Sequence, residues 1–268
     1  MHPIRIGTCG WSYSEWSGVF YPEGVRATEF LSFYAERFPV VEVDSTFYRS
    51  PSQKTVQGWR DKTPDGFGLS LKVPRVITHE KVLVDCEKEL GEFLSAARTL
   101  ENKLLCCVLQ FSYFNRQAFS SLDKFLSRLE PFLAAWPRDV PVAVELRNKN
   151  WLTASLLDCL RRYQATWVVA DQAWMPSPLS LAQKLDLVTG PYGYVRLLGH
   201  REEVEALTTT FDHTVVDRRE QIEADAQAIR LLSGKVPVVV FVNNHFAGYA
   251  PETIRLLQEA LGRAGPAA

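Results

Sequence analysis

Eight short apolar runs recur along the chain, and no other sequence feature restricts the fold as strongly. The runs are continuous rather than alternating, which is typical of parallel strands that are buried on both faces. They comprise residues 4–8, 40–46, 67–73, 104–110, 142–146, 166–170, 192–198 and 238–242. We therefore predict eight parallel β-strands.

Segments of helical length separate most of these runs. Their apolar residues recur at spacings of three and four, as Leu90, Phe93, Leu94 and Ala97 do, and this period predicts amphipathic helices. The predicted helices comprise residues 28–38, 87–100, 116–134, 153–163, 215–232 and 252–261. Alternation of strand and helix implies a parallel sheet, and eight repeats within 268 residues favour a single (β/α)8 barrel of the TIM type.

Two segments depart from this alternation. Residues 12–27, after the first strand, are irregular, and residues 171–190, after the sixth, leave room for a short helix at most. Because of these gaps, an open doubly wound sheet remains an alternative to the barrel. The chain has no linker or low-complexity tract, so residues 1–268 are predicted to form one domain.

Composition restricts the function more than the fold. Thirty basic and 31 acidic residues give a net charge of -1, so the chain lacks the long-range field that attracts nucleic acid or an anionic membrane. Its five cysteines form no Cys-x-x-Cys pair and are expected to be reduced. The first residues lack the apolar segment of a signal peptide, and no apolar run approaches the roughly 18 residues of a membrane helix. These features predict a cytoplasmic protein.

Polar residues interrupt the apolar strands at defined positions. In the third strand Lys72 lies on the face opposite Leu69 and Leu71, and in the fifth strand Glu145 and Arg147 share a face. Similar positions at or near strand ends hold Glu42, Asp44, Gln110, Asp171, Arg196 and Asn243. Seven strands are thus expected to place a polar side chain at the C-terminal mouth of the barrel, where sites form in this fold.

This polar ring contains four acids and three bases. It can be interpreted as an ion-pair network that serves only stability, because buried charges are costly unless they pair. It can also be interpreted as a ligand site. In that case the three bases indicate an anionic group on the ligand, such as a phosphate or carboxylate; they are Lys72, Arg147 and Arg196.

The polar strand ends also fall within longer motifs. These are residues 7–13 (Gly-Thr-Cys-Gly-Trp-Ser-Tyr), 41–48 (Val-Glu-Val-Asp-Ser-Thr-Phe-Tyr), 72–79 (Lys-Val-Pro-Arg-Val-Ile-Thr-His), 145–147 with Trp151, 194–199 and 241–245 (Phe-Val-Asn-Asn-His). Through them the chain resembles, over nearly its whole length, domain-of-unknown-function family 72, also called the YecE-like family. The resemblance implies a barrel fold and supplies no activity.

The chain also departs from the pattern of the family it resembles. Asp44 stands where Asn is usual, which makes the mouth more acidic, and Asn148 stands where His is frequent. Residues 111–113 are Phe-Ser-Tyr where relatives tend to have Leu-Pro-Pro. These changes alter the expected chemistry of the mouth and the shape of the fourth loop.

Two kinds of catalysis fit such a mouth. A single divalent metal would take its ligands from Glu42, Asp44, Glu145, Asp171 and His245. The interleaved Lys and Arg compete with a metal for these acids, and the three histidines near strand ends are too few for a multi-zinc site. A metal-free acid–base enzyme would use Glu145 as base and Lys72 or His245 as acid. No nicotinamide, flavin or phosphate-loop motif is present, so no cofactor is predicted.

The leading hypothesis is a hydrolase or lyase that acts on a small phosphorylated or otherwise anionic substrate at the mouth. Arg147 and Arg196 would hold the anion. Catalytic roles are assigned to Glu42, Lys72, Glu145, Asp171 and His245. Ligand contacts are assigned to Trp11, Tyr13, Asp44, Tyr48, His79, Gln110, Arg147, Arg196, Asn243 and Asn244.

The alternative hypothesis is a nucleic-acid or nucleotide-binding protein, or a repair-type nuclease. It depends on aromatic residues of the first two loops, which would stack on a base or sugar ring; these are Trp11, Tyr13, Trp16, Phe47 and Tyr48. The two hypotheses differ in the shape of the site. An enzyme for small anions predicts a small polar pocket, whereas nucleic-acid binding predicts a long exposed groove with basic rims.

Overall fold

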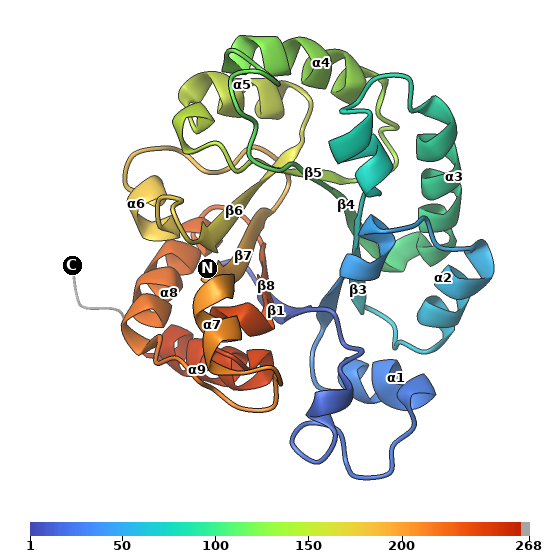
Figure 1. The fold of residues 1–268 in the computed structure, drawn as a ribbon, viewed down its shortest axis with the longest axis vertical. Coiled ribbons are helices and arrows are strands. Elements are labelled where there is room, and N and C mark those ends of the chain that lie inside the picture. Colours follow the sequence, from blue (N-terminus) through green and yellow to red (C-terminus); the bar gives the residue numbers. More distant parts are fainter. Residues whose placement is uncertain (264–268) are drawn as a thin grey trace.

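The computed structural model describes residues 1–263 and contains a closed barrel of eight parallel strands. The strands follow one another around the barrel in chain order, and the last pairs with the first from Ile4↔Val238 to Thr8↔Val242. This pairing confirms the predicted barrel and excludes the open sheet (Figure 1). The strands are β1 (Ile4–Cys9), β2 (Val40–Val43), β3 (Gly68–Lys72), β4 (Leu104–Gln110), β5 (Val142–Glu145), β6 (Thr166–Gln172), β7 (Gly193–Gly199) and β8 (Val238–Val242).

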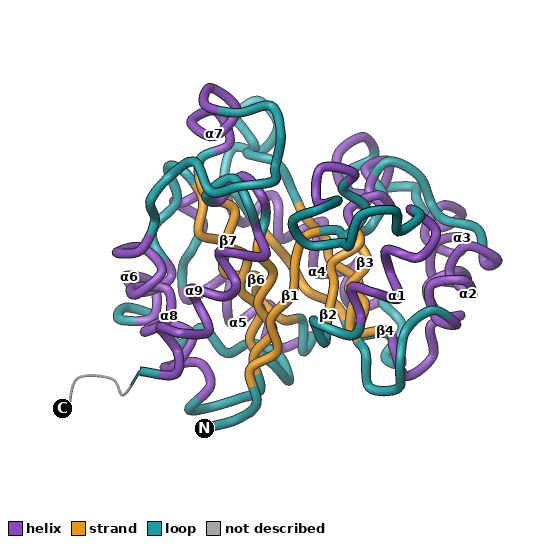
Figure 2. The backbone as a smooth tube through the Cα atoms, turned by 90° about the horizontal axis from the view of Figure 1, so that it is seen from below, coloured by secondary structure: helices purple, strands orange, loops and turns teal. Residues whose placement is uncertain are grey.

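Helices surround the strands (Figure 1). The α-helices are α1 (Phe30–Ala35), α2 (Gln53–Asp61), α3 (Glu87–Ala97), α4 (Leu122–Ala135), α5 (Ala154–Arg162), α6 (Pro178–Ala182), α7 (Arg201–Leu207), α8 (Arg219–Ser233) and α9 (Ala250–Gly262). Short 3-10 helices are η1 (Ser14–Trp16), η2 (Ala27–Glu29), η3 (Asp44–Phe47), η5 (Arg98–Lys103), η6 (Lys149–Trp151) and η7 (Asn244–Phe246), and η4 (Val76–Glu80) is a π-helix turn. Figure 2 shows α7, which follows β7, beyond the end of the barrel opposite the N-terminus.

Side chains along each strand alternate between the barrel interior and the helix layer. The interior holds a compact apolar cluster made of Cys9, Val40, Cys106, Val108, Ala143, Val168, Tyr194, Val239 and Phe241. A larger apolar cluster fills the space between strands and helices and includes Leu69, Val144 and Val169. The position of a residue within its strand therefore decides whether a polar side chain faces the interior or the helices.

Two predicted helices are markedly shorter in the structure, each by five residues. The predicted helix 28–38 is reduced to α1, because Pro39 disfavours helical geometry in the residue before it. The predicted helix 116–134 begins later, as α4, at a cap in which the Ser121 side chain accepts a hydrogen bond from the Lys124 amide. Both differences arise from local backbone chemistry at a helix end.

The sequence did not predict α2 and α7. Each helix buries a single apolar residue, Val56 in α2 and Val204 in α7, so neither carries the broad apolar stripe of an amphipathic helix. The short helix expected within residues 171–190 is α6. Within residues 1–263, no helix combines the length and apolar character that crossing a membrane requires.

Candidate functional site

Arg196 lies at the centre of the barrel interior and is almost fully buried. Its Nη1 donates to Glu145 Oε2 at 2.5 Å and its Nη2 to Glu42 Oε1 at 2.6 Å. The Tyr194 hydroxyl, from the same strand, donates to Glu42 Oε2 at 2.5 Å. Both carboxylates are inaccessible to solvent. One cation from β7 therefore connects two buried acids, one on β2 and one on β5.

Burial and charge act in opposite directions on these acids. Burial opposes the ionisation of Glu145, but the charges of Arg196 and Arg147 outweigh it and lower its pKa to about 2. Burial raises the pKa of Glu42, and the charge of Arg196 offsets only part of that effect. Burial also raises the pKa of Tyr194, so its phenol remains a donor. Glu145 is thus a permanent anion rather than a base at neutral pH.

A second set of charges lies closer to solvent. Lys72 Nζ is 3.1 Å from Asp44 Oδ1 and lies 5.0 Å from the centre of the Phe47 ring. Arg147 Nε donates to Glu145 Oε1 at 3.1 Å. The side chains of Asp44 and Arg147 are 33% and 30% exposed. Within the described part of the chain, the two terminal nitrogens of Arg147 have no hydrogen-bond partner and are free to meet a ligand.

These charges lie at the base of a cavity of about 670 Å³ at the C-terminal ends of the strands. The predicted residues that line it are Tyr13, Asp44, Tyr48, Lys72, His79, Gln110, Arg147, Arg196, Asn243, Asn244 and His245. Phe47, which the nucleic-acid alternative assigned to stacking, also lines it, together with Arg75, His200 and Arg201. Lining side chains that the sequence did not assign to the site include Gln172, Trp174, Glu202 and Phe211. Of these, Gln172 was detectable from strand alternation, because it shares the inward parity of Val168.

The prediction that Asp171 faces the mouth is wrong. Asp171 has the parity of Trp167 and Val169, which pack on the helix side of β6. It accepts a hydrogen bond from Gln221 and lies beside Asp225, both on α8. A position near a strand end is therefore not enough to place a side chain in the mouth.

Three other predicted residues also lie outside the surface of the cavity. Glu42 and Glu145 point into the barrel but are covered by Arg196, so their role is to hold that cation. Trp11 packs edge-on against Trp59, with 5.9 Å between ring centres. Glu42 and Glu145 therefore do not line the cavity, and the catalytic roles assigned to them stay predictions.

His79 lines the cavity beside the cations. Its Nδ1 is 2.8 Å from Thr78 Oγ1, and its ring contacts the edge of Phe47 with 4.9 Å between centres. Burial lowers its pKa, and the positive charges of Arg147 and Lys72 lower it further. The imidazole is therefore neutral at neutral pH, and Nε2 remains available to exchange a proton.

His245 is held more tightly than His79. Its Nδ1 is 2.8 Å from Asn243 Oδ1 and its Nε2 is 3.1 Å from Glu205 on α7. Burial lowers its pKa, against the effect of Glu205. Asn244 uses its Oδ1 to accept from the Ala250 amide. These contacts make the residues after β8 a fixed rim, with both His245 nitrogens already engaged.

The acidic residues do not form a set that fits a divalent metal. Among the described residues, one group of possible ligands converges, with ligand atoms of Cys9, Glu42 and Asp44 within 4.8 Å of one another. Arg196 Nη2 lies among them, 2.6 Å from Glu42 Oε1, 3.7 Å from Asp44 Oδ1 and 3.8 Å from Cys9 Sγ. The guanidinium holds the position that a metal cation would take. Burial also raises the pKa of the Cys9 thiol, whereas metal binding requires a thiolate.

Curated relatives match about half of the chain. The UPF0759 protein YecE of Escherichia coli (strain K12) is 30% identical over 149 residues, 55% of this chain and 50% of that protein. The UPF0759 protein YunF of Bacillus subtilis (strain 168) is 26% identical over 160 residues, 56% of this chain and 52% of that protein. The chain thus spans about half the length of the curated relatives that it matches.

Solved structures match the whole fold. A DUF72 family protein from Thermotoga maritima MSB8 (TM1631) superposes with a TM-score of 0.77 at 27% identity, over 98% of this chain and 100% of that chain. A D-psicose 3-epimerase superposes with a TM-score of 0.55 at 11% identity, over 88% of this chain and 84% of that chain, which shows a shared barrel fold alone. The family model "Protein of unknown function DUF72" matches residues 5–268. With that match over nearly its full length, the chain belongs to the DUF72 family.

Proposed function

We propose that the mouth cavity is the active site of a hydrolase or lyase that acts on a small phosphorylated or otherwise anionic substrate. The observation that carries this proposal is the state of Arg147. Arg147 donates to Glu145 through Nε alone. The two terminal nitrogens of Arg147 have no hydrogen-bond partner among the described residues, and the side chain lines the cavity. A guanidinium in this state offers paired donors to a phosphate or carboxylate. Lys72, from the neighbouring part of the ring, adds a second cation.

Proton transfer in this proposal falls to His79, and Asp44 supplies a fixed negative charge beside Lys72. His79 is neutral at neutral pH because burial and the nearby cations lower its pKa, so it can accept a proton from a bound substrate. Asp44 is held ionised, since the charges of Lys72 and Arg196 outweigh burial and lower its pKa. Glu42 and Glu145 act indirectly, as hydrogen-bond acceptors that position Arg196 beneath the cavity.

Two exposed aromatic side chains at the cavity extend the proposal to the rest of the substrate. Tyr48 is 74% exposed and Trp174 is 68% exposed, and both line the cavity. Trp174 also has a positive φ of 55°, a conformation that is unfavourable for a bulky residue. Large exposed aromatic rings beside an anion site favour a substrate that stacks on them, through the C–H face of a sugar or the flat base of a nucleoside. The same feature is what the nucleic-acid alternative would use.

The test compares inorganic phosphate binding by the wild-type protein, Arg147→Ala and Lys149→Ala, measured by isothermal titration calorimetry. Arg147→Ala is expected to weaken phosphate binding roughly tenfold or more, because it removes a charged pair of donors. Lys149→Ala is the matched control, since Lys149 is exposed, two residues away and outside the cavity lining. Equal affinity in the wild type and Arg147→Ala would overturn the proposed anion site.

A second measurement addresses catalysis. The wild-type protein and His79→Gln are assayed against a panel of phosphate esters of sugars and nucleosides. A turnover that depends on His79 is expected in the wild type, with kcat reduced and KM little changed in the variant, because the imidazole moves a proton rather than binding the anion. An activity that His79→Gln leaves unchanged would exclude His79 from proton transfer.

A further inference from the structure

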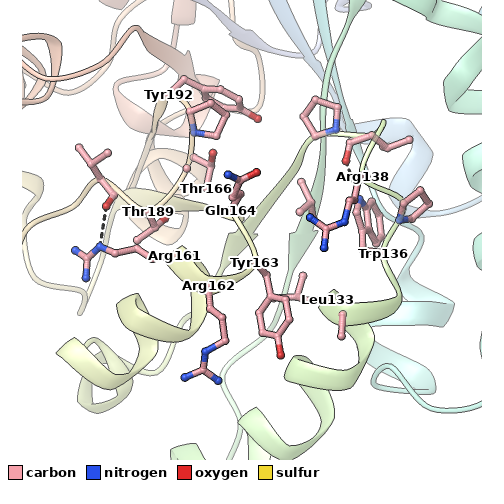
Figure 3. Close-up of a pocket in the computed structure, with 18 residues that line it drawn as sticks. Leu133, Trp136, Arg138, Arg161, Arg162, Tyr163, Gln164, Thr166, Thr189 and Tyr192 are labelled. Carbon is pink, nitrogen blue, oxygen red and sulfur yellow. Dashed lines mark hydrogen bonds between the residues drawn. The ribbon is translucent and has the colours of Figure 1, made fainter.

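The cavity at the opposite end of the barrel lacks the buried charges of the mouth. It has a volume of about 880 Å³ and lies beside the first residues of β5 and β6 (Figure 3). Of the three arginines that line it, Arg138 and Arg162 are exposed and Arg161 donates to the Val188 carbonyl at 3.1 Å. The mouth therefore remains the place where charged groups are positioned, and one of the loops around it has an unusual backbone.

This loop, residues 76–86, follows β3 and is strained. Within residues 1–263, three of the six non-glycine residues with a positive φ lie in it: Val82 (45°), Leu83 (67°) and Asp85 (50°). Left-handed backbone is unfavourable for a residue with a Cβ, and most of all for a β-branched residue such as Val82. The loop also contains the π-helix turn η4, a rare conformation that is frequent at functional sites. Such strain persists only where the surrounding structure fixes the backbone, and it clusters at ligand sites.

The strained loop carries His79 to the mouth. The π turn closes where the Lys81 amide donates to the Val76 carbonyl at 2.9 Å. The next contact joins the left-handed residues back to the turn, because the Leu83 amide donates to the Ile77 carbonyl at 2.9 Å. The position of the His79 imidazole therefore depends on the left-handed residues that follow the turn.

The side chain of Lys81 connects these residues to helix α3. Its Nζ donates to the Asp85 carbonyl at 2.6 Å and to Glu89 Oε1 at 2.7 Å. Asp85 is one of the left-handed residues, and Glu89 lies in the first turn of α3. The side chains of Lys81 and Glu89 are 36% and 27% exposed, so the pair is partly protected from solvent. One ammonium group thus holds the end of the strained loop on a helix.

We propose that Lys81 is a positioning residue for the mouth. Bound to Glu89, it keeps the loop in its left-handed form and thereby keeps the His79 ring inside the cavity. The inference rests on the proposed function, in which His79 moves a proton. The charged groups whose fields act on this ring come from β3, from β5 and from the residues that follow them: Lys72, Arg75, Glu145 and Arg147.

A competing explanation assigns the loop conformation to apolar packing alone. Ile77 is inaccessible to solvent and Leu83 is 8% exposed, so both anchor the loop in the core. In that case the pair of Lys81 and Glu89 would contribute as little as most surface ion pairs do. The two explanations differ in what happens to His79 when either charged residue is removed.

The test is an NMR titration of the His79 imidazole in the ligand-free protein. The chain has five histidines, and the spectrum of His79→Gln identifies the signal of His79. Lys81→Met and Glu89→Ala should both raise the pKa of His79 toward its ordinary value, because the ring leaves its half-buried position beside Arg147. Glu89→Ala is the sharper variant, since the loss of a negative charge alone would lower that pKa.

The controls are variants that leave the contact intact. Glu92→Ala removes an exposed acid from the same helix and should leave the pKa of His79 as it is in the wild type. Lys81→Arg keeps a cationic donor and should restore the wild-type pKa. A pKa of His79 that neither Lys81→Met nor Glu89→Ala changes, or that falls in Glu89→Ala, would overturn the positioning role and favour apolar packing.

Phosphate binding separates this inference from the proposed function. Lys81→Met should bind phosphate as the wild type does, because Arg147 is unchanged; a loss of affinity would mean a general disturbance of the mouth and would contradict the proposal. If the wild type hydrolyses a phosphate ester, Lys81→Met should lower kcat roughly tenfold or more with KM little changed. A wild-type protein that binds no phosphate would remove the proposed function, whereas the NMR comparison would still decide whether Lys81 positions His79.

Discussion

Arg196 donates to two carboxyl groups that have no access to water, and its removal would leave Glu42 without its cation and Glu145 with Arg147 as its remaining ion-pair partner among the described residues. We expect Arg196→Gln to lower the free energy of unfolding by about 3–5 kcal/mol, the usual effect of breaking a buried ion pair from one side. Arg147→Gln should cost less than about 1 kcal/mol, because that arginine is partly exposed and contacts only one of the acids. Urea denaturation of both variants measures the difference, and equal losses would contradict a central role for Arg196.

Gly7 permits a close approach between β1 and the chain entering β2. A Cβ at Gly7 would lie 1.9 Å from the carbonyl oxygen of Val40, a backbone atom that cannot move without disturbing the barrel. We expect Gly7→Ala to cost about 3 kcal/mol or more, or to prevent folding. Gly91→Ala in α3 is the control, because nothing lies within 4 Å of a Cβ there and the helix should gain about 0.5–1 kcal/mol. A Gly7→Ala protein as stable as the wild type would refute the close approach.

At the scale of elements, strand β6 contacts helix α8 through a pair of carboxyl groups, Asp171 on β6 and Asp225 on α8. Burial raises the pKa of Asp225 well above its usual range, and the nearby charge of Asp171 raises it further. Burial also raises the pKa of Asp171, against hydrogen bonds from Asp225 and Gln221. An acid whose pKa is raised by folding contributes stability below its unfolded pKa, and that contribution is lost as the pH rises through the folded pKa.

The prediction for this pair therefore concerns pH. The free energy of unfolding should fall as the pH is raised from about 5 to about 9, and Asp225→Asn should make this fall smaller, since the amide cannot ionise. Glu220→Gln, an exposed substitution on the same helix, should leave the slope as it is in the wild type. Urea midpoints across this pH range give the comparison. Parallel profiles for the wild type and Asp225→Asn would mean that the pair does not titrate between the folded and unfolded states.

The same elements show why the sequence predicted some of the site and missed the rest. In β3 and β5 the direction of each side chain follows from simple alternation along the strand. The sequence alone therefore predicted that Lys72 and Arg147 face the mouth. Asp171 was predicted to face the mouth because it lies near the end of a strand. Alternation along β6 would have placed its side chain on the helix side, where it contacts Gln221. Arg196 meets partners 51 and 154 residues away, and no local pattern says which acids a buried arginine will find.

The loop residues of the mouth were missed for a related reason. Trp174 and Phe211 line the cavity from segments that lack strand or helix periodicity. Their positions depend on how the segments after β6 and β7 fold back over the barrel. The spacing of apolar residues in the sequence does not predict the conformation of such loops. The two exposed helical segments, α2 and α7, were missed because their stability comes from contacts with neighbours rather than from an apolar stripe.

At the scale of the whole molecule, charge is balanced both globally and locally. The net charge is -1, and the buried acids of the mouth are matched by Arg196, Lys72 and Arg147. Such a molecule has little long-range field, so recognition of an anion depends on contacts made inside the cavity. The volume of about 670 Å³ is in the range of pockets for small ligands rather than of a groove that follows a polymer.

This balance gives a prediction that separates the two functions considered from the sequence. A single-stranded oligonucleotide of about 12 nucleotides should bind weakly, and raising the salt from about 50 to about 200 mM should change that affinity little, because few phosphates are neutralised at once. A nucleic-acid-binding protein would instead lose orders of magnitude in affinity over this range. Fluorescence anisotropy with labelled oligonucleotide makes the measurement, with Trp174→Ala as the companion variant. Tight, salt-sensitive binding that Trp174→Ala abolishes would favour the nucleic-acid function and assign the exposed rim to base stacking.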